Sequence, residues 1–132
     1  MNSERRLTLD LWHEILFVRR LGGLGDWLAE DIVFHSPFLW KPYHGRYPVF
    51  VILNTVSKVF RDFAYHRELV VDDVWALEFG AAVGELSIKG IDLIELNDDG
   101  LIQKFEVFVR PANGLLALGD EMQRRLTEQG FA

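Results

Sequence analysis

Asp92 is the residue with the clearest chemical potential, because it interrupts an apolar strand pattern. Residues 86–96 alternate, and one face of the predicted strand carries Leu86, Ile88, Gly90, Asp92, Ile94 and Leu96. Since this face is otherwise apolar, we expect it to face the core or a pocket. Gly90 lies two residues before Asp92 and leaves room beside it. A protonated acid in an apolar cavity can donate a hydrogen bond to a ligand oxygen, whereas an ionised one can act as a base.

A purely structural role for Asp92 is the alternative interpretation. An unpaired buried carboxylate is costly, so the protein must either supply a hydrogen-bond donor or let the acid take up a proton. Tyr65, a histidine or a backbone amide could hold Asp92 and so tie the sheet together. Buried aspartates are rare without a paired role, and the sequence leaves both interpretations open.

The sequence offers little support for other kinds of catalytic site. Cysteine is absent, which excludes disulfides, thiolate catalysis and thiolate metal sites. Gly22-Gly23-Leu24-Gly25 lacks the preceding strand of a dinucleotide fingerprint, and no serine has a G-x-S-x-G setting. We expect neither a metal nor a cofactor, because the histidines form no H-x-H, H-x-x-x-H or H-E-x-x-H pattern. The histidines are His13, His35, His44 and His66.

The composition predicts one soluble domain over residues 1–132. Hydrophobic residues make up 49 % of the 132, which suits a single core, and the 13 % of aromatic residues can fill that core or line a pocket. The net charge of −6 argues against nucleic acid or an anionic membrane as the main partner. No run of 18 apolar residues occurs, and Met1–Arg6 leads into an amphipathic segment rather than a signal peptide. We therefore expect a cytoplasmic protein.

Helical periodicity dominates the first half of the chain. Apolar residues recur at helical spacing over residues 7–18, and Gly22-Gly23 ends that segment. We predict a short helical turn over residues 26–30 and then a strand over residues 32–36, which Pro37 ends. A long helix is predicted from about residue 46 to residue 60.

The second half changes to strand periodicity from residue 62. Asn97-Asp98-Asp99-Gly100 has the composition of a tight hairpin turn and joins the strand over residues 86–96 to another over residues 101–110. A last helix is predicted after Pro111. Helices followed by an antiparallel meander place the chain in the α+β class.

Three segments resemble the nuclear-transport-factor-2-like superfamily, and within it the SnoaL-like domain. They are Ala29-Glu30-Asp31-Ile32-Val33-Phe34-His35-Ser36-Pro37, Tyr43-His44-Gly45-Arg46 and residues 90–102. The resemblance implies a cone, in which a strongly curved mixed β-sheet wraps around N-terminal helices and opens at one end onto an apolar cavity. It also implies a homodimer, often formed through the outer face of the sheet. It does not imply one function, because this fold hosts many.

Ketosteroid isomerases of this superfamily are the most useful comparison for the site. Asp92 falls on the position of their oxyanion-donor aspartate, Ser36 on that of the general-base aspartate, and Trp12 on that of the donor tyrosine. Serine cannot take a carbon-bound proton at neutral pH without help, and an indole only donates. The resemblance therefore implies that the typical ketosteroid isomerase mechanism does not operate here. The aspartate–histidine pair of SnoaL-like cyclases and the arginine-bridged aspartates of related epoxide hydrolases have no clear match.

The sequence thus predicts Asp92 as the candidate catalytic residue, in a cavity that Trp12, Ser36, Tyr65 and Trp75 line as ligand-binding residues. The expected function is binding of a hydrophobic small molecule, or cofactor-independent acid/base chemistry of the isomerase, cyclase, dehydratase or epoxide-hydrolase type. The alternative is a non-catalytic dimeric module that binds a protein partner, which a filled cavity and an exposed apolar patch would favour.

Overall fold

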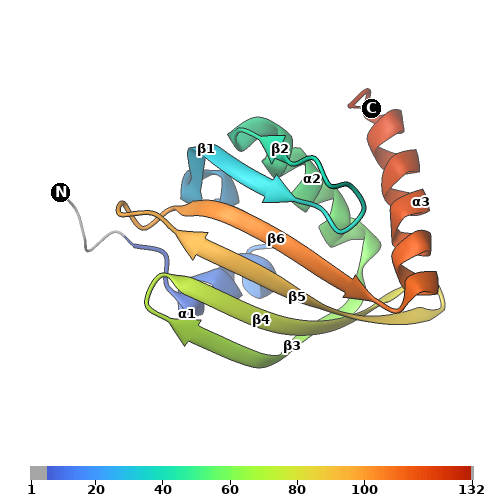
Figure 1. Cartoon of the computed structure of the whole chain (residues 1–132), viewed down its shortest axis with the longest axis horizontal. Helices are drawn as coiled ribbons and strands as arrows, with labels where there is room; N and C mark the ends of the chain where they lie inside the picture. Colours follow the sequence, from blue (N-terminus) through green and yellow to red (C-terminus); the bar gives the residue numbers. More distant parts are fainter. Residues whose placement is uncertain (1–5, 132) are drawn as a thin grey trace.

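A single curved sheet organises the molecule. The computed structural model describes residues 6–131, so residues 1–5 and 132 of the predicted domain lie outside the described residues. The strands are β1 (Leu28–His35), β2 (Tyr43–His44), β3 (Arg61–Val71), β4 (Val74–Val83), β5 (Leu86–Leu96) and β6 (Ile102–Arg110). They follow the order β2-β1-β6-β5-β4-β3, with β1 parallel to β6 and the other pairs antiparallel (Figure 1). The predicted α+β class and curved mixed sheet are confirmed.

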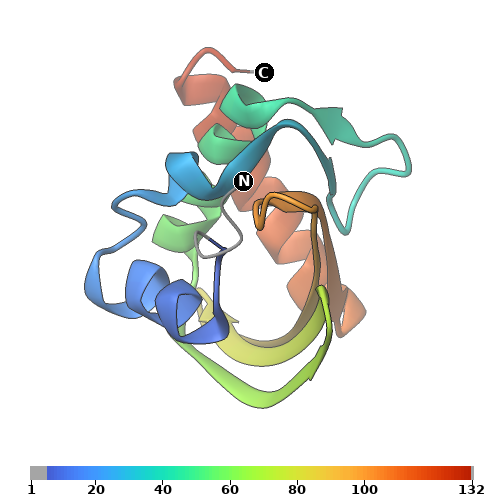
Figure 2. The ribbon, with the colours of Figure 1, turned by 90° about the vertical axis from the view of Figure 1, so that its left-hand side faces the viewer.

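The helices cover the concave side of the sheet and one of its ends. They are α1 (Leu9–His13), its π-helical continuation η1 (Glu14–Val18), the 3₁₀-helix η2 (Leu24–Trp27), α2 (Arg46–Val59) and α3 (Ala112–Glu128). Figure 2 shows the sheet as a trough, with α1 on one side and α2 across the opening. The C-terminal helix α3 packs against α2 and the ends of β5 and β6. Among residues 6–131, no helix is long and apolar enough to cross a membrane.

Strand β5 buries alternate residues, as the alternation of residues 86–96 predicts. Ile88, Gly90, Asp92 and Ile94 are buried, while the residues between them lie on the outer face. The facing residues of β4 belong to the same core, because Leu77 pairs with Asp92 and Phe79 with Gly90. The hairpin turn is also confirmed. The Asn97 side-chain oxygen accepts from the backbone nitrogens of Asp99 at 2.9 Å and Leu101 at 3.1 Å.

The helical turn predicted over residues 26–30 is present as the 3₁₀-helix η2, but the prediction for residues 28–30 is wrong. The 3₁₀-helix ends at Trp27, and β1 begins at Leu28 with two buried residues followed by two exposed ones. A shift in the pairing of β1 with β6 between Leu28 and Val33 produces this pattern. Such an irregularity breaks the period of two, so residues that form a strand carry helix-like spacing in the sequence.

Candidate functional site

A cavity of about 490 Å³ lies between the concave face of the sheet and the helices. This volume is typical of sites for small organic ligands. Its inner part is built from buried apolar side chains of several elements, among them Trp12, Phe34, Ile52, Phe105 and Leu118. Its mouth is formed by the exposed members of the lining: Phe17, Arg20, Phe38, Ser57 and Lys58. The lining is therefore largely apolar, and its exposed members face solvent.

Asp92 lies in the inner part of this cavity, where its carboxyl group meets little water. On β5 it stands between two apolar neighbours, Leu77 of β4 and Val107 of β6, and 7 % of its surface is exposed. Burial disfavours the charged form and raises the pKa of Asp92 to about 7, against a smaller lowering by the hydrogen bond from Tyr65. At neutral pH the acid is therefore divided between its neutral and ionised forms.

Three side chains form a hydrogen-bond chain that ends on Asp92. The indole Nε1 of Trp12 donates to the Tyr65 hydroxyl at 2.9 Å, and that hydroxyl donates to Oδ2 of Asp92 at 2.7 Å. The direction of the first bond is fixed because an indole nitrogen can only donate. Burial, followed by the charge of Asp92, raises the pKa of Tyr65 well above its ordinary value, so the hydroxyl keeps the proton that it donates.

The geometry of this chain distinguishes the two carboxyl oxygens of Asp92. Oδ2 accepts from Tyr65, which makes Oδ1 the favoured site for the proton of the neutral acid. Oδ1 has no hydrogen-bond partner among residues 6–131. Every fully buried side-chain oxygen or nitrogen in this part of the chain has a partner, so Oδ1 is not fully buried. Because Asp92 lines the cavity, we place Oδ1 at its surface, where it can donate to a ligand when protonated or accept when ionised.

Aromatic packing holds Tyr65 in the position that this chain requires. Its ring lies 5.2 Å from Phe63 edge to face, 5.8 Å from His13 in a stacked arrangement and 6.1 Å from Phe17 edge to face. Phe63 in turn stacks on Phe79 at 5.0 Å. Such contacts restrict ring rotation, so the hydroxyl is preorganised toward Asp92.

The space beside Gly90 serves this aromatic packing rather than the ligand. A Cβ atom at Gly90 would collide with the ring of Phe79 and with the backbone oxygen of Phe108. The expected room near Asp92 is therefore filled by Phe79. Glycine allows β4, β5 and β6 to approach closely enough to bury that ring.

The ligand-binding residues predicted from the sequence lie in three settings. Trp12 and Ser36 line the cavity together with Asp92. Tyr65 is outside the lining and contacts both Trp12 and Asp92 from behind them. Trp75 is buried on β4 opposite Ile94 and does not line the cavity. Direct ligand contacts by these residues stay predictions.

His13 was not assigned to the site by sequence reasoning. Its ring stacks on Tyr65, and its Nε2 pairs with Glu68, so it supports the hydrogen-bond chain without touching Asp92. The spacing of His13 along the chain gives no signal, because the contact depends on how α1 and β3 meet. Within the part of the chain that the structure describes, no group of three or more histidine or carboxylate side chains could hold a metal ion.

Comparison with known proteins identifies relatives among solved structures. A steroid delta-isomerase from Pseudomonas aeruginosa is 52 % identical, with a TM-score of 0.89 over 94 % of this chain and 92 % of that one. An uncharacterised protein with a cystatin-like fold from Silicibacter pomeroyi is 45 % identical, with a TM-score of 0.77 over 79 % and 74 %. An NTF2-like protein from Mesorhizobium loti shares the fold at 16 % identity, with a TM-score of 0.69 over 78 % of this chain and 88 % of that one. No family model and no curated protein matches the chain.

Proposed function

Since this chain belongs to the nuclear-transport-factor-2-like superfamily, we propose that it binds a hydrophobic small molecule and transfers a proton through Asp92 in a cofactor-independent, isomerase-type reaction. The observation that carries this proposal is the oxygen Oδ1 of Asp92, unpartnered within residues 6–131 and placed at an apolar cavity. A pKa of about 7 suits a group that must both give and take a proton near neutral pH. Membership of the superfamily alone would not select a reaction.

The proposed chemistry is a proton shift that one carboxyl group performs twice. Ionised Oδ1 removes a proton from a carbon next to a ligand carbonyl, and the C–H electron pair moves to form an enolate. The same oxygen then returns the proton to a more distant carbon of the conjugated system, which moves a double bond and restores the carboxylate. Asp92 must serve both steps, because no other acidic side chain of residues 6–131 lines the cavity.

Ser36 does not supply the missing base. Its Oγ accepts from the backbone nitrogens of Phe38 and Leu39, both at 3.3 Å, and so holds the turn that follows β1. Among residues 6–131, this hydroxyl has no hydrogen bond to a base that could activate it, so it serves as a polar contact at most. This is why a reaction that needs two separate carboxylates is not proposed.

The test is isomerisation of a β,γ-unsaturated ketosteroid, followed by ultraviolet absorbance of the conjugated product and by deuterium uptake from heavy water. Asp92→Asn should lower the rate at least ~100-fold, the low end for loss of a general acid–base group. Asp120→Asn, which removes an exposed carboxylate from α3, is the matched control and should keep the rate. Ligand binding without conversion or exchange would leave a binding protein. Unchanged activity in Asp92→Asn would refute the proposed role of this residue.

We also propose that two copies associate through the outer face of the sheet. Ile91 and Phe108 pair across β5 and β6 and are 40 % and 48 % exposed, and Leu69 and Val74 extend the apolar surface over β3 and β4. Exposed large apolar residues on neighbouring strands of a sheet are typical of an interaction site. Sedimentation of the purified protein tests this proposal, with a mass of about twice 15.3 kDa expected and a monomer at micromolar concentration contradicting it.

A further inference from the structure

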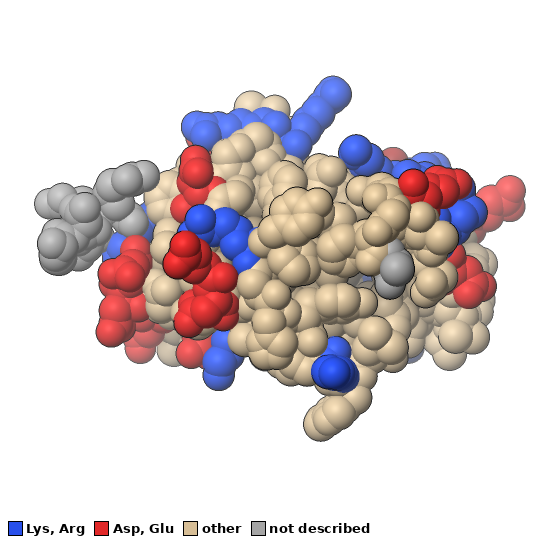
Figure 3. Space-filling view, turned by 90° about the horizontal axis from the view of Figure 1, so that it is seen from above, with Lys and Arg blue, Asp and Glu red and all other residues tan. Residues whose placement is uncertain are grey.

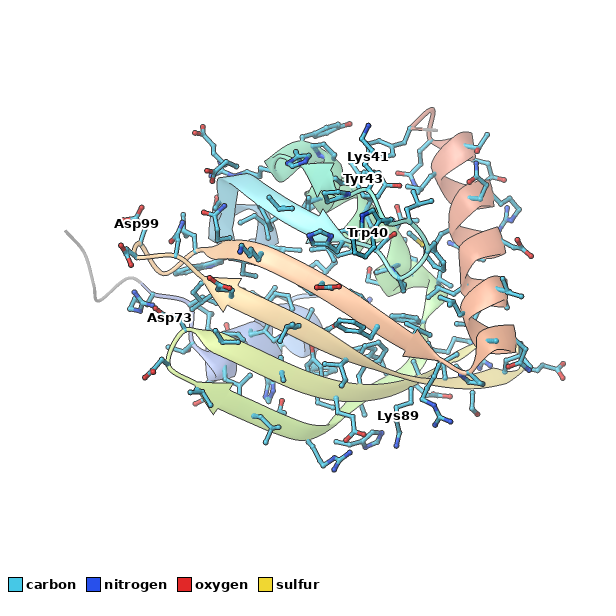
Figure 4. All side chains as sticks on the ribbon, viewed as in Figure 1. Trp40, Lys41, Tyr43, Asp73, Lys89 and Asp99 are labelled. Atoms are coloured by element: carbon cyan, nitrogen blue, oxygen red, sulfur yellow. The ribbon has the colours of Figure 1, made fainter. Side chains whose placement is uncertain are left out.

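The cavity differs in charge between its inner end and its mouth. Asp92 is the one acidic residue of its lining within residues 6–131, although the chain has 20 acidic residues. At the mouth the charged members of the lining are Arg20 and Lys58. Many acidic side chains gather instead at the end of the molecule where Asp73 and Asp99 lie (Figures 3 and 4), and neither of these two lines the cavity.

Neither cation at the mouth is engaged by another side chain. Among residues 6–131, Arg20 and Lys58 have no hydrogen-bond or ion-pair partner. The preceding residue is a useful contrast, since Arg19 donates from Nε to Glu14 at 2.8 Å and forms an ion pair with it. Most other arginines of the described chain are likewise paired with a carboxylate or a backbone carbonyl. Two unpaired cations at the entrance to an apolar cavity attract an anion electrostatically.

The backbone at Arg20 is strained. Arg20 and Leu21 have φ angles of +51° and +71°, values that residues with a Cβ atom rarely adopt. They follow directly on the π-helix η1 and Arg19, and the Leu21 backbone nitrogen donates to the Ile15 oxygen at 2.7 Å. Leu21 is thereby buried, while Arg20 remains exposed at the cavity mouth. Strain and π-helical turns of this kind are concentrated at functional sites.

We propose that the ligand is an amphipathic anion. Its apolar body fills the aromatic interior with the carbon that gives up its proton next to Oδ1 of Asp92, and a negatively charged group lies at the mouth near Arg20 and Lys58. This inference rests on the proposed ligand binding and adds the chemical class of the ligand. A carboxylate is the simplest head group with this chemistry, because both cations can donate hydrogen bonds to it.

Competition between a charged and an uncharged ligand of equal chain length tests the charge preference. Neutral N-phenyl-1-naphthylamine, whose fluorescence rises in apolar sites, reports occupancy of the cavity, and decanoate or decan-1-ol displaces it. The measured quantity is the ratio of the Kd of decanol to the Kd of decanoate. This ratio should fall about fivefold or more in the Arg20→Gln/Lys58→Gln double variant, since each exposed ion pair contributes up to about a fivefold effect. The Kd of decanol should stay the same.

Lys41→Gln is the control for loss of a positive charge. Lys41 lies on the segment between β1 and β2 (Figure 4) and is not part of the cavity lining, so its removal should leave the ratio unchanged. Raising the ionic strength should lower the ratio in the unmodified protein, because salt screens exposed charges. If the ratio of the two Kd values in the double variant stays within twofold of that in the unmodified protein, the anion inference is overturned, while binding in the cavity still stands. Failure of the reporter to bind the unmodified protein would instead overturn the proposed function.

Discussion

Replacing Asp92 by Asn tests whether a buried acid with a raised pKa is present. Asn has nearly the same shape, and its side-chain oxygen can still accept the hydrogen bond from Tyr65. The substitution therefore removes the titration and leaves the packing between Leu77 and Val107 in place. Stability should then depend on pH differently in the two proteins.

The size of the difference follows from the pKa of Asp92 in the folded and unfolded chain. Burial raises it from an ordinary 3.8 to about 7. The folded state therefore holds this proton more tightly than the unfolded state does, and the resulting stability is present below pH 4 and is lost as the pH rises through 7. A rise in pKa of about 3 corresponds to about 4 kcal/mol of folding free energy, because a pKa change of one is worth 1.36 kcal/mol. Relative to Asp92→Asn, the free energy of unfolding of the unmodified protein should fall by about this amount between pH 4 and pH 8.

Urea denaturation of both proteins from pH 4 to pH 9 measures this difference. Subtracting the two free energies cancels the titration of other groups, such as Glu78, whose pKa is lowered to about 2 by its hydrogen bond with Arg67. Asp120→Asn removes an exposed carboxylate and should show no comparable slope. A difference that stays flat between pH 4 and pH 8 would refute the argument, because Asp92 would then ionise as it does in water.

Three other substitutions probe the support of the site and the outer sheet face. Tyr65→Phe removes a hydrogen bond that lowers the pKa of Asp92, so the titration midpoint of the Asp92 carboxyl ¹³C resonance should move to higher pH. The same substitution should lower the free energy of unfolding by about 1–3 kcal/mol, because the Trp12 indole loses its acceptor. Gly90→Ala should cost about 1–3 kcal/mol in thermal or urea unfolding because its Cβ collides with Phe79; an unchanged midpoint would contradict that contact. Phe108→Lys should shift sedimentation toward the monomer without changing the circular dichroism spectrum, and an unaltered mass would place the interface elsewhere.

The sequence predicts the position of Asp92 because β5 is regular in that region. From Val74 to Val83, each residue of β4 faces a single residue of β5, so period-two alternation translates directly into an inner and an outer face. The same reasoning fails in β1, where the pairing with β6 shifts between Leu28 and Val33. Alternation is therefore informative only where pairing is unbroken, and a bulge leaves little trace in residue type.

The mouth of the cavity could not be predicted in this way. Arg20 reaches it through a π-helix followed by two residues with positive φ, and neither Arg20 nor Leu21 is a residue type that signals this backbone. For Trp75, an inward-facing aromatic residue, the alternation predicts a place in the cavity lining that the structure does not give it. It packs opposite Ile94, two positions along β5 from Asp92, and is outside the cavity lining. Periodicity selects a face, whereas the position along the strand decides between core and cavity.

The hydrogen-bond chain explains why tryptophan at position 12 preserves one part of the proposed chemistry. A tyrosine there could either donate to Tyr65 or accept from it, so the proton of Asp92 could sit on either oxygen. The indole removes that choice because it only donates, and the Tyr65 hydroxyl donates its own proton to Oδ2. In the proposed reaction, the proton that Asp92 exchanges with a ligand therefore passes through Oδ1. With Ser36 unable to act as a base, the proposed acid and base functions both fall to this one oxygen, and the Asp92 pKa of about 7 suits both.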